Sequence, residues 1–264
     1  KGFKYGPATM LDAVAWDGLT DSLSHEAMGE LTESGNGERN IARAEQDEVA
    51  AASHQRAARA QSEGVFEGEI APVEIPQRKG DPLVVSQDEG VRPDTTAESL
   101  GALRPAFAKD GTITAGNSSP LSDGAAALVV TSRAFAEEKG LTILATVGAP
   151  GQTAGPDSSQ LHSQPSDAIA AAVRKQGWDV ADLDFIEINE AFGAVAVQSL
   201  RDLDYPHEKT NIHGGAIALG HPIGASGARL ALHAALELDR RDGGRAAVSL
   251  CGGGGQGEAL ILFR

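Results

Sequence analysis

Short apolar runs alternate with amphipathic helices through the second half of the chain, and this alternation limits the possible fold more than any other feature. Two helices are predicted at residues 165–176 and 225–238, each with an apolar row at helical spacing, and Gly177 ends the first. Strands are predicted at 185–188, 246–250 and 259–263. Because strands that alternate with helices form a sheet covered by helices, we expect an α/β layered domain.

The first half of the chain is polar and rich in turns. Its clearest element is a predicted helix at residues 41–62, which Gly64 closes. Prolines punctuate the segment after this helix, so only short strands are expected there. Further predicted elements are strands at 65–73, 83–85, 112–115, 125–130 and 141–147, and helices at 132–138 and 190–200.

Charge and hydropathy exclude several classes of partner. The net charge is −15, which argues against binding a nucleic acid over a broad face. The pairs Arg39 with Arg43 and Arg240 with Arg241 are interpreted as solvated helix faces. No apolar run reaches transmembrane length, and the first residues lack the apolar core of a signal peptide. We therefore expect a cytoplasmic protein that binds neither nucleic acid nor membrane.

Three segments stand where a predicted strand ends or a predicted helix begins. Asn189 directly follows a buried strand, and Cys251 ends another strand before a glycine-rich turn. His221 precedes Pro222, which disfavours a helical conformation and holds the imidazole in a rigid turn. Such positions face ligands in α/β folds. The three segments are residues 189–192, 214–224 and 251–257.

Taken singly, each of these residues also has an ordinary structural interpretation. Asn189 could cap the following helix, and His221 could be a structural residue of its turn. Cys251 is the only cysteine, which excludes an intramolecular disulfide and a multi-cysteine metal site, but it could be a small buried hydrophobe. No metal is expected. The segment 251–257 also fits the spacing G-x-G-x-x-G, but a strand rather than a helix follows it, which disfavours dinucleotide binding.

Together and in this order, the three segments resemble the C-terminal signature blocks of thiolases, the acyl-CoA C-acyltransferase family. Similar segments continue through the chain at 12–21, 28–29, 43–47, 104–107 and 114–117. The resemblance implies a thiolase-like layered α-β-α fold in three parts. These would be an α+β loop domain for CoA binding and oligomer contacts (1–115), a remnant of the N-terminal half-domain (116–142) and the C-terminal half-domain (143–264).

The resemblance also implies a role for each candidate site residue. Thiolases join or split acyl-CoA thioesters with a nucleophilic cysteine and a second cysteine that acts as acid and base. Cys251 would be that second cysteine, a role that suits a thiol whose pKa falls toward neutrality. His221 would activate the nucleophile and donate to the thioester oxygen, and Asn189 would hold a water that supplies a second donor. The backbone N–H of Gly253 would help to bind the oxyanion of the acyl-enzyme.

The implied ligand is CoA or acyl-CoA, as a substrate rather than a tightly bound cofactor. Arg92 matches a family position near the adenine, although alone it could equally be a surface charge. Ser119 matches one that hydrogen-bonds the pantetheine. The apolar residues Met28, Phe107 and Phe192 match positions along the pantetheine tunnel. A homodimer or homotetramer is also implied.

The resemblance leaves out the start of a thiolase. The part that carries the nucleophilic cysteine has no counterpart here, and Cys251 cannot serve in both roles. We favour a longer polypeptide over a truncated one, and expect these 264 residues alone to be inactive. The implied reaction is Claisen condensation of acyl-CoA thioesters or thiolytic cleavage of 3-ketoacyl-CoA, with acetyl-CoA and acetoacetyl-CoA as substrates.

Two alternatives come from other classes of protein. One is a non-catalytic thiolase-like subunit that binds acyl-CoA or a protein partner, and the other is a hydrolase that uses Cys251 with His221. The hydrolase lacks a recognisable third group to orient the histidine. Three smaller departures from the family pattern are Ala27 before Met28, Pro120 after Ser119, and His213 ahead of the glycine pair.

Overall fold

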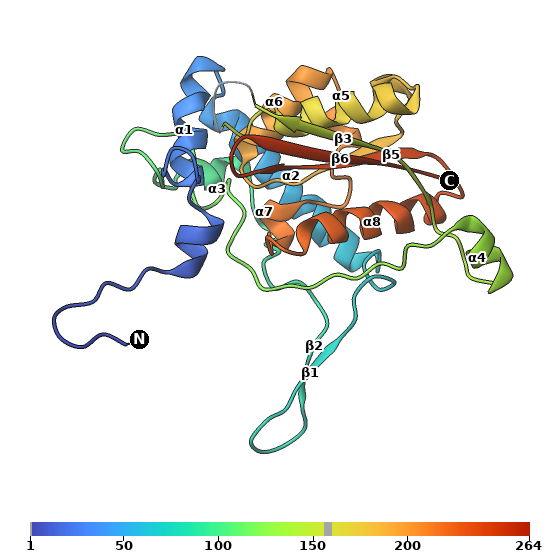
Figure 1. The fold of residues 1–264 in the computed structure, drawn as a ribbon, viewed down its shortest axis with the longest axis horizontal. Helices are drawn as coiled ribbons and strands as arrows, with labels where there is room; N and C mark the ends of the chain where they lie inside the picture. The colour runs from blue at the N-terminus through green and yellow to red at the C-terminus, as the bar shows by residue number, and fades with distance from the viewer. Residues whose placement is uncertain (1, 156–159) are drawn as a thin grey trace.

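A four-stranded sheet lies at the centre of the protein in the computed structural model, which describes residues 2–155 and 160–264 (Figure 1). The strand order is β3-β6-β5-β4. β4 and β5 are parallel, whereas β6 is antiparallel to both β3 and β5. The strands are β3 (Thr146–Ala154), β4 (Phe185–Ile188), β5 (Arg245–Gly252) and β6 (Gln256–Phe263).

Helices cover both faces of this sheet (Figure 1). On one face, α5 (Gln164–Gln176) packs Ile169 and Val173 against Ile186 of β4, and α6 (Gly193–Leu203) lies beside α5. On the other face, α8 (Ser226–Arg240) packs Leu230 against Phe185. Phe185 and Ile186 point to opposite faces because successive strand side chains alternate. The predicted layered α/β fold is therefore confirmed.

Close packing of α5 onto the sheet depends on two glycines. A Cβ added to Gly151 of β3 would lie 1.9 Å from the backbone oxygen of Ala168. At Gly257 of β6, it would lie 2.2 Å from the backbone oxygen of Gln164. Neither helix carbonyl can move without moving α5, so the absence of a side chain at both positions sets the distance between helix and sheet.

Helix α2 (Arg43–Ser62) is the main element of the first half and packs against the sheet domain. Its alanines form a narrow apolar face, and Ala50 and Ala51 contact Ile217. The remaining helices are η1 (Val14–Gly18), α1 (Met28–Glu38), α3 (Ala97–Gly101), α4 (Arg133–Glu138), η2 (Val180–Asp182), η3 (His207–Lys209) and α7 (Ala216–Leu219).

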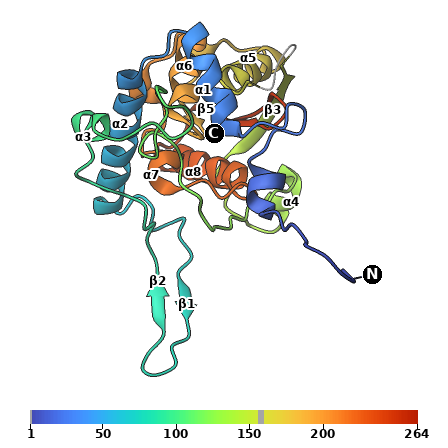
Figure 2. The ribbon, with the colours of Figure 1, turned by 90° about the vertical axis from the view of Figure 1, so that its left-hand side faces the viewer.

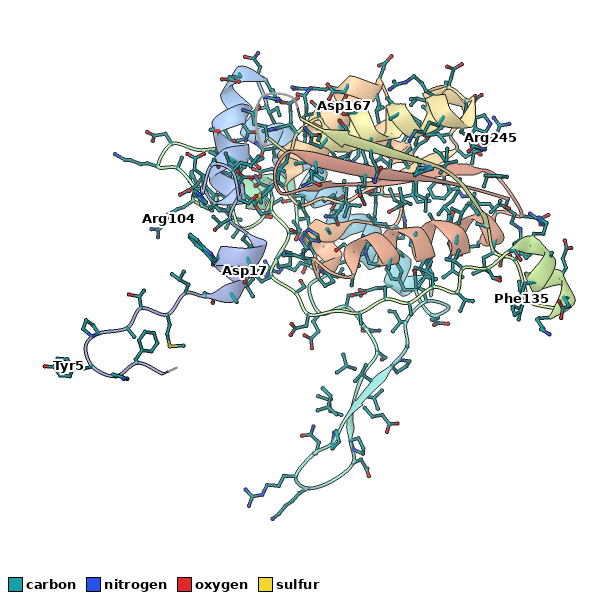
Figure 3. All side chains as sticks on the ribbon, viewed as in Figure 1. Tyr5, Asp17, Arg104, Phe135, Asp167 and Arg245 are labelled. Atoms are coloured by element: carbon teal, nitrogen blue, oxygen red, sulfur yellow. The ribbon has the colours of Figure 1, made fainter. Side chains whose placement is uncertain are left out.

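Two segments extend away from this body. The strands β1 (Val73–Ile75) and β2 (Leu83–Val85) form a protruding antiparallel hairpin with exposed apolar side chains (Figure 2). The N-terminal arm is also extended, and Figure 3 places Tyr5 near its far end, fully exposed. None of the helices described is both long and apolar enough to cross a membrane.

Most predicted elements are confirmed, with shifts at their ends, because apolar periodicity reports burial directly. The helix predicted at 190–200 begins three residues later, at Gly193. The strand predicted at 141–147 begins only at Thr146 and continues to Ala154. The strand predicted at 65–73 is mostly wrong, because helical turns continue after α2 and Ile70 N–H donates to the Phe66 carbonyl.

Two further predicted strands are wrong, because neither has a pairing strand along its length. At 112–115 the backbone forms one antiparallel bridge, between Thr114 and Pro105, and side chains take its amides: the Glu33 carboxylate accepts from Thr112 and Ile113, and the Asn117 amide oxygen accepts from Thr114 N–H. At 125–130, no other strand pairs with the backbone in the described part of the chain, and Val129 is exposed. Apolar sequence alone does not make a strand without a neighbour.

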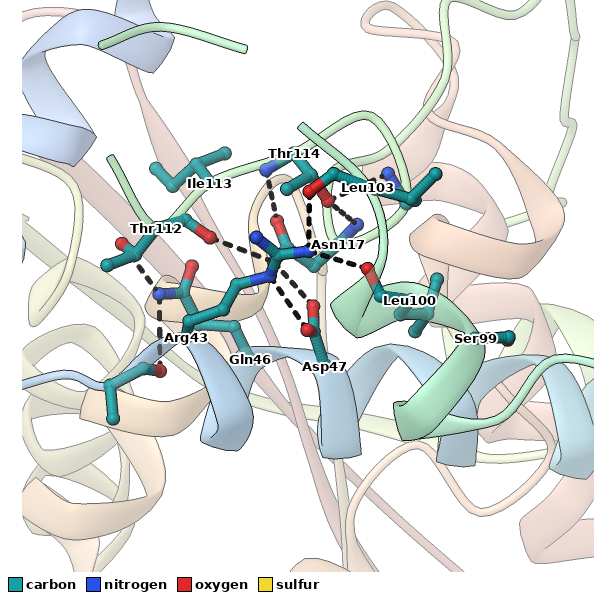
Figure 4. A network of polar contacts seen from close by, with 12 residues as sticks. Arg43, Gln46, Asp47, Ser99, Leu100, Leu103, Thr112, Ile113, Thr114 and Asn117 are labelled. Carbon is teal, nitrogen blue, oxygen red and sulfur yellow. Dashed lines mark hydrogen bonds and ion pairs between the residues drawn. The ribbon is translucent and has the colours of Figure 1, made fainter. Parts of the chain in front are cut away.

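A polar network joins α2 to the turn at residues 112–117 (Figure 4). Arg43 donates to Asp47 at 2.7 Å and to the Leu100 carbonyl at 2.6 Å. Asp47 also accepts from the Asn117 side chain at 2.8 Å. The interpretation of Arg43 as a solvated residue was therefore wrong. Its guanidinium holds Asp47, whose carboxylate in turn accepts from the Asn117 side chain.

The packing of α5 yields a prediction. Gly151→Ala should lower the free energy of unfolding by about 3 kcal/mol, because the new methyl group overlaps the Ala168 carbonyl. Gly37→Ala is the matched control: Gly37 is exposed in the last turn of α1 with open space at Cβ, and alanine should stabilise by up to about 1 kcal/mol. Urea denaturation of both variants measures the difference. Equal stabilities would contradict the packing argument.

Candidate active site

Strand β4 presents Asn189 at its carboxyl end. All four residues of β4 are buried, and the Asn189 N–H donates to the Ser249 carbonyl of β5 at 2.9 Å. Asn211 brackets the preceding residue, since its side-chain oxygen accepts from Ile188 N–H at 2.8 Å and its amide donates to the Ile188 carbonyl at 2.9 Å. The Asn189 side chain therefore projects from a backbone fixed on two sides.

His221 reaches the same place from a different direction. Helix α7 ends at Leu219 and is followed by Gly220, whose φ of +93° favours glycine. His221 and Pro222 come next, before α8 begins. The His221 Nε2 lies 3.2 Å from the Asn189 Nδ2, so the structure brings these two predicted residues into contact. The His221 Nδ1 lies 2.6 Å from the Ser226 hydroxyl, at the start of α8.

The surrounding hydrogen bonds favour one tautomer of the imidazole. The Ser226 hydroxyl donates to the Pro222 carbonyl at 3.1 Å, so its oxygen accepts from Nδ1–H of His221. The lone pair on Nε2 then accepts from the Asn189 amide. Burial lowers the pKa of His221, and the charge of Arg229 lowers it further. His221 is therefore a neutral imidazole with its basic nitrogen toward Asn189, which suits a general base.

Asn189 has one polar atom left over. Its Oδ1 is buried and makes no hydrogen bond with any residue that the structure describes. A buried acceptor of this kind is costly unless a donor completes it. The side chain thus combines a donor already engaged with His221 and an acceptor that can take a hydrogen bond from a bound molecule.

Cys251 lies at the same edge of the sheet. It stands near the end of β5, two residues after Ser249, and pairs with Gly257 across the β5–β6 turn. No hydrogen bond joins its thiol to His221 or Asn189 within residues 2–155 and 160–264. The structure therefore places Cys251 at the edge of the sheet where Asn189 emerges, without direct contact.

The protonation of Cys251 differs from expectation. Burial raises the pKa of the thiol to about 12, whereas a value near neutrality was expected. The physical reason is that the only opposing influence is a backbone hydrogen bond at Cys251 itself. A neighbouring imidazole does not lower the pKa, because His221 is neutral and engaged with Asn189. Cys251 is a thiol in this structure, and so a potential proton donor.

The glycine-rich turn after Cys251 contacts the first half of the chain. Gly254 and Gly255 have φ of +78° and +67°, and the Gly254 N–H donates to the buried Asp21 carboxylate at 2.9 Å. A Cβ on Gly253 would lie 2.6 Å from the methyl group of Met28. The turn joins two antiparallel strands, as the sequence predicts, which is not the strand-to-helix context of a dinucleotide site.

The residues predicted to contact CoA lie close together beside Asn189, with one exception. The rings of Phe107 and Phe192 meet edge to face with centroids 5.9 Å apart. Ser119 donates from its backbone and its hydroxyl to the Ala191 carbonyl, at 3.0 and 3.1 Å. Ala191 is two residues after Asn189, so this group adjoins the site. The exception is Arg92, an exposed residue whose backbone N–H donates to His54 and which no described contact joins to the others.

The sequence interpretation gave no role to four residues that shape the site, namely Ser226, Asn211, Ser53 and Glu190, although Glu190 lies in the segment 189–192 that it singled out. Each makes its decisive contact with a residue distant in sequence or several positions away, so no local pattern singles it out. Polar residues directly after a buried strand or at the start of a helix were the only available signal. His213, which departs from the family pattern, contacts buried His233: its Nδ1 lies 3.1 Å from the His233 Nε2.

Comparisons with known proteins agree with this geometry. A family profile described as "Thiolase, N-terminal domain" matches residues 1–134, and one described as "Thiolase, C-terminal domain" matches residues 141–264. The chain is similar to a probable acetyl-CoA acetyltransferase of Mycolicibacterium smegmatis, with 59% identity over 100% of this chain and 68% of the relative.

Solved structures give the same result. The chain is similar to the acetyl-CoA acetyltransferase of Bacillus anthracis, with a TM-score of 0.93 and 41% identity over 99% of this chain and 66% of the other. It is also similar to human mitochondrial 3-ketoacyl-CoA thiolase, with a TM-score of 0.89 and 38% identity over the same shares. The chain thus spans about two thirds of the length of these relatives.

The role of Ser226 is open to test. Ser226→Ala should remove the acceptor for Nδ1–H, so that His221 populates both neutral tautomers instead of one. The ¹⁵N shifts of the imidazole report the tautomer directly. Ser249→Ala removes another buried hydroxyl, which bonds only to carbonyls away from His221, and should leave the tautomer unchanged. An unaltered His221 spectrum in Ser226→Ala would refute the assignment.

Proposed function

Because the chain belongs to the thiolase family, we propose that it carries the acid/base half of an acyl-CoA C-acyltransferase site. The proposed reaction is Claisen condensation of acyl-CoA thioesters or the reverse thiolytic cleavage of 3-ketoacyl-CoA. Acetyl-CoA and acetoacetyl-CoA are the proposed substrates, in line with the names of the bacterial relatives. The observation that carries the proposal is the contact of Asn189 with His221 at the strand edge that also bears Cys251.

The proposed role of His221 follows from its tautomer. A neutral ring with a basic Nε2 can take the proton of a nucleophilic thiol and thereby activate it. The resulting imidazolium can donate from Nε2 to a thioester oxygen as negative charge develops there. Asn189 would supply the second group at this oxygen through a water, from which its unpaired Oδ1 can accept a hydrogen bond.

A resting thiol at Cys251 suits the first step in either direction. Splitting a 3-ketoacyl-CoA releases an enolate that needs a proton, and acyl transfer from acyl-CoA releases a CoA thiolate that needs one too. After giving up its proton, Cys251 becomes the base that removes the α-proton in the second step of synthesis. The raised pKa makes this thiolate a strong base once formed. The backbone N–H of Gly253 would help to bind the oxyanion of the acyl-enzyme.

The proposed CoA site uses the cluster beside Asn189. Phe107, Phe192 and Met28 offer apolar surface for the pantetheine, and the Ser119 oxygen keeps lone pairs for an amide N–H. Arg92 is proposed at the adenine end, where an exposed cation suits a phosphorylated nucleotide. CoA is a substrate in this scheme, and no tightly bound cofactor is proposed.

The wider proposals concern organisation. The loop domain (1–115), the N-terminal remnant (116–142) and the C-terminal half-domain (143–264) stay proposals, as do a cytoplasmic location and a homodimer or homotetramer. Exposed apolar side chains on the hairpin and the N-terminal arm support assembly. The chemistry needs two cysteines and these 264 residues hold one, so we propose that they are inactive without a second cysteine from elsewhere.

The proposal is tested with the full polypeptide that carries this sequence. Cys251→Ser should reduce cleavage of acetoacetyl-CoA by CoA, and condensation of acetyl-CoA, by about 10²- to 10⁴-fold, because a hydroxyl is a much weaker acid than a thiol and does not form the anion that acts as base. Ser249→Ala, a buried substitution on the same strand, should retain activity. CoA release and acetoacetyl-CoA absorbance measure the two directions.

Other outcomes would identify the alternatives. Binding of acyl-CoA without turnover in either direction would favour a non-catalytic thiolase-like subunit. Thioester hydrolysis that disappears in Cys251→Ala, without any acyl transfer, would favour a hydrolase. If acetoacetyl-CoA is not cleaved and Cys251→Ser changes nothing, the proposed function fails for short substrates.

A further inference from the structure

Glu190 is a buried carboxylate at the junction of three elements. It is 2% exposed and accepts three hydrogen bonds. The Ser53 hydroxyl donates to its Oε2 at 2.6 Å, and the Ile217 N–H donates to the same oxygen at 3.2 Å. The Asn211 amide donates to Oε1 at 2.7 Å. Both oxygens are therefore engaged, and every partner is a donor.

Each donor belongs to a segment that adjoins Asn189, leads to His221 or forms part of α2. Asn211 brackets Ile188, the residue before Asn189. Ile217 lies in the first turn of α7. This helix ends at Leu219, and Gly220 connects it to His221. Ser53 belongs to α2 and also accepts from the Gly215 N–H at 3.0 Å. Glu190 itself follows Asn189 directly, so one carboxylate links both segments to α2.

From these contacts we infer that Glu190 is a positioning residue, which holds the Asn189 and His221 segments at their 3.2 Å separation and fixes both to helix α2. The positioning follows from the geometry alone. Its consequence for catalysis rests on the proposed function.

The hydrogen bonds favour a side chain with two acceptor oxygens over an amide. Three donors face Glu190, and a carboxylate has only acceptors. The pKa of Glu190 is raised, because the effect of burial exceeds that of the bonds from Ser53, Asn211 and Ile217, which each lower it. A glutamine at this position would turn an N–H₂ group toward at least one of these donors. The substitution changes almost no volume and removes part of the anchor.

The atoms around the Glu190 carboxylate are closely packed. A Cβ on Gly215 would lie 2.3 to 2.5 Å from the Glu190 carboxylate atoms. Gly214 has a φ of +84°, and a Cβ there would lie 2.6 Å from the Ser53 backbone oxygen. The glycine pair therefore lets the start of α7 lie against both α2 and Glu190. This close approach is what allows a single carboxylate to reach all three segments.

Glu187 provides a matched control on the same strand. It is fully buried, three residues earlier, but neither carboxylate oxygen has a hydrogen-bond partner among the described residues. Burial raises the pKa of Glu187 to about 7. Glu187→Gln thus removes a buried charge without removing any hydrogen bond, whereas Glu190→Gln breaks an anchor. Both variants make the same chemical change at the same depth.

Kinetics on the full polypeptide give the first test. Glu190→Gln should lower kcat roughly 100-fold, the size expected when a catalytic group is displaced by about 1 Å. The KM for acyl-CoA should change by less than about threefold, because the proposed CoA contacts do not involve Glu190. Glu187→Gln should leave both parameters as in the wild type. A Glu190→Gln protein with wild-type kcat would overturn the inference.

A second test does not depend on activity. The His221 imidazole, labelled with ¹⁵N and assigned with His221→Gln, is titrated in each variant. In Glu190→Gln its pKa should rise toward the ordinary value and its Nε2 shift should change, because the ring loses burial and the Asn189 contact. Arg229 of α8, whose charge also lowers the pKa of His221, is present in both variants. An unaltered titration would overturn the inference, and Glu187→Gln should show none of these shifts.

The two tests separate the possible failures. If the wild type has no acyltransferase activity but His221 responds as described, the proposed function fails and the positioning role stands. If Glu190→Gln does not fold, Ser53→Ala replaces it, since it removes one donor and keeps the carboxylate. Ser53→Ala should move the His221 titration in the same direction by a smaller amount. A folded Ser53→Ala protein with an unchanged titration would also contradict the inference.

Discussion

The parallel pairing of β4 with β5 is the constraint on which the rest of the site depends. Its register places Ile188 opposite Ser249, and the Asn189 N–H continues the ladder by one more bond. Both strands end at one edge of the sheet, so the chain after β4 and the turn after β5 must emerge together. β4 is buried on both faces between α5 and α8, which holds this edge in place. Asn189 and Cys251 lie at the same edge of the sheet because of this pairing.

Around that edge, the protein assembles proton carriers that are neutral at rest. Burial keeps the His221 imidazole uncharged and the Cys251 thiol protonated. Glu190, one residue after Asn189, accepts hydrogen bonds from three donors. A proton can then move between neutral groups without a permanent charge beside a bound thioester.

Apolar periodicity predicted the sheet, the covering helices and the position of each candidate residue at a strand or helix end. It failed at 125–130, where apolar residues lack a pairing strand, and at 112–115, where Glu33 and Asn117 take the backbone amides. The contact between Asn189 and His221 joins residues far apart in sequence and could be expected only from the resemblance to thiolases. The roles of Ser226 and Glu190 could not be predicted, because they depend on contacts that only the folded chain creates.

In the proposed site, Asn189, His221 and Cys251 act on one bound thioester, and a crystal structure of the full polypeptide with acetoacetyl-CoA would show whether they do. We predict that the thioester oxygen lies within about 3 Å of the His221 Nε2, with the Cys251 sulfur about 3.5 Å from the carbon between the two carbonyl groups. The pantetheine should lie along Met28, Phe107 and Phe192. A well-ordered acyl-CoA whose thioester contacts neither His221 nor Cys251 would contradict the account.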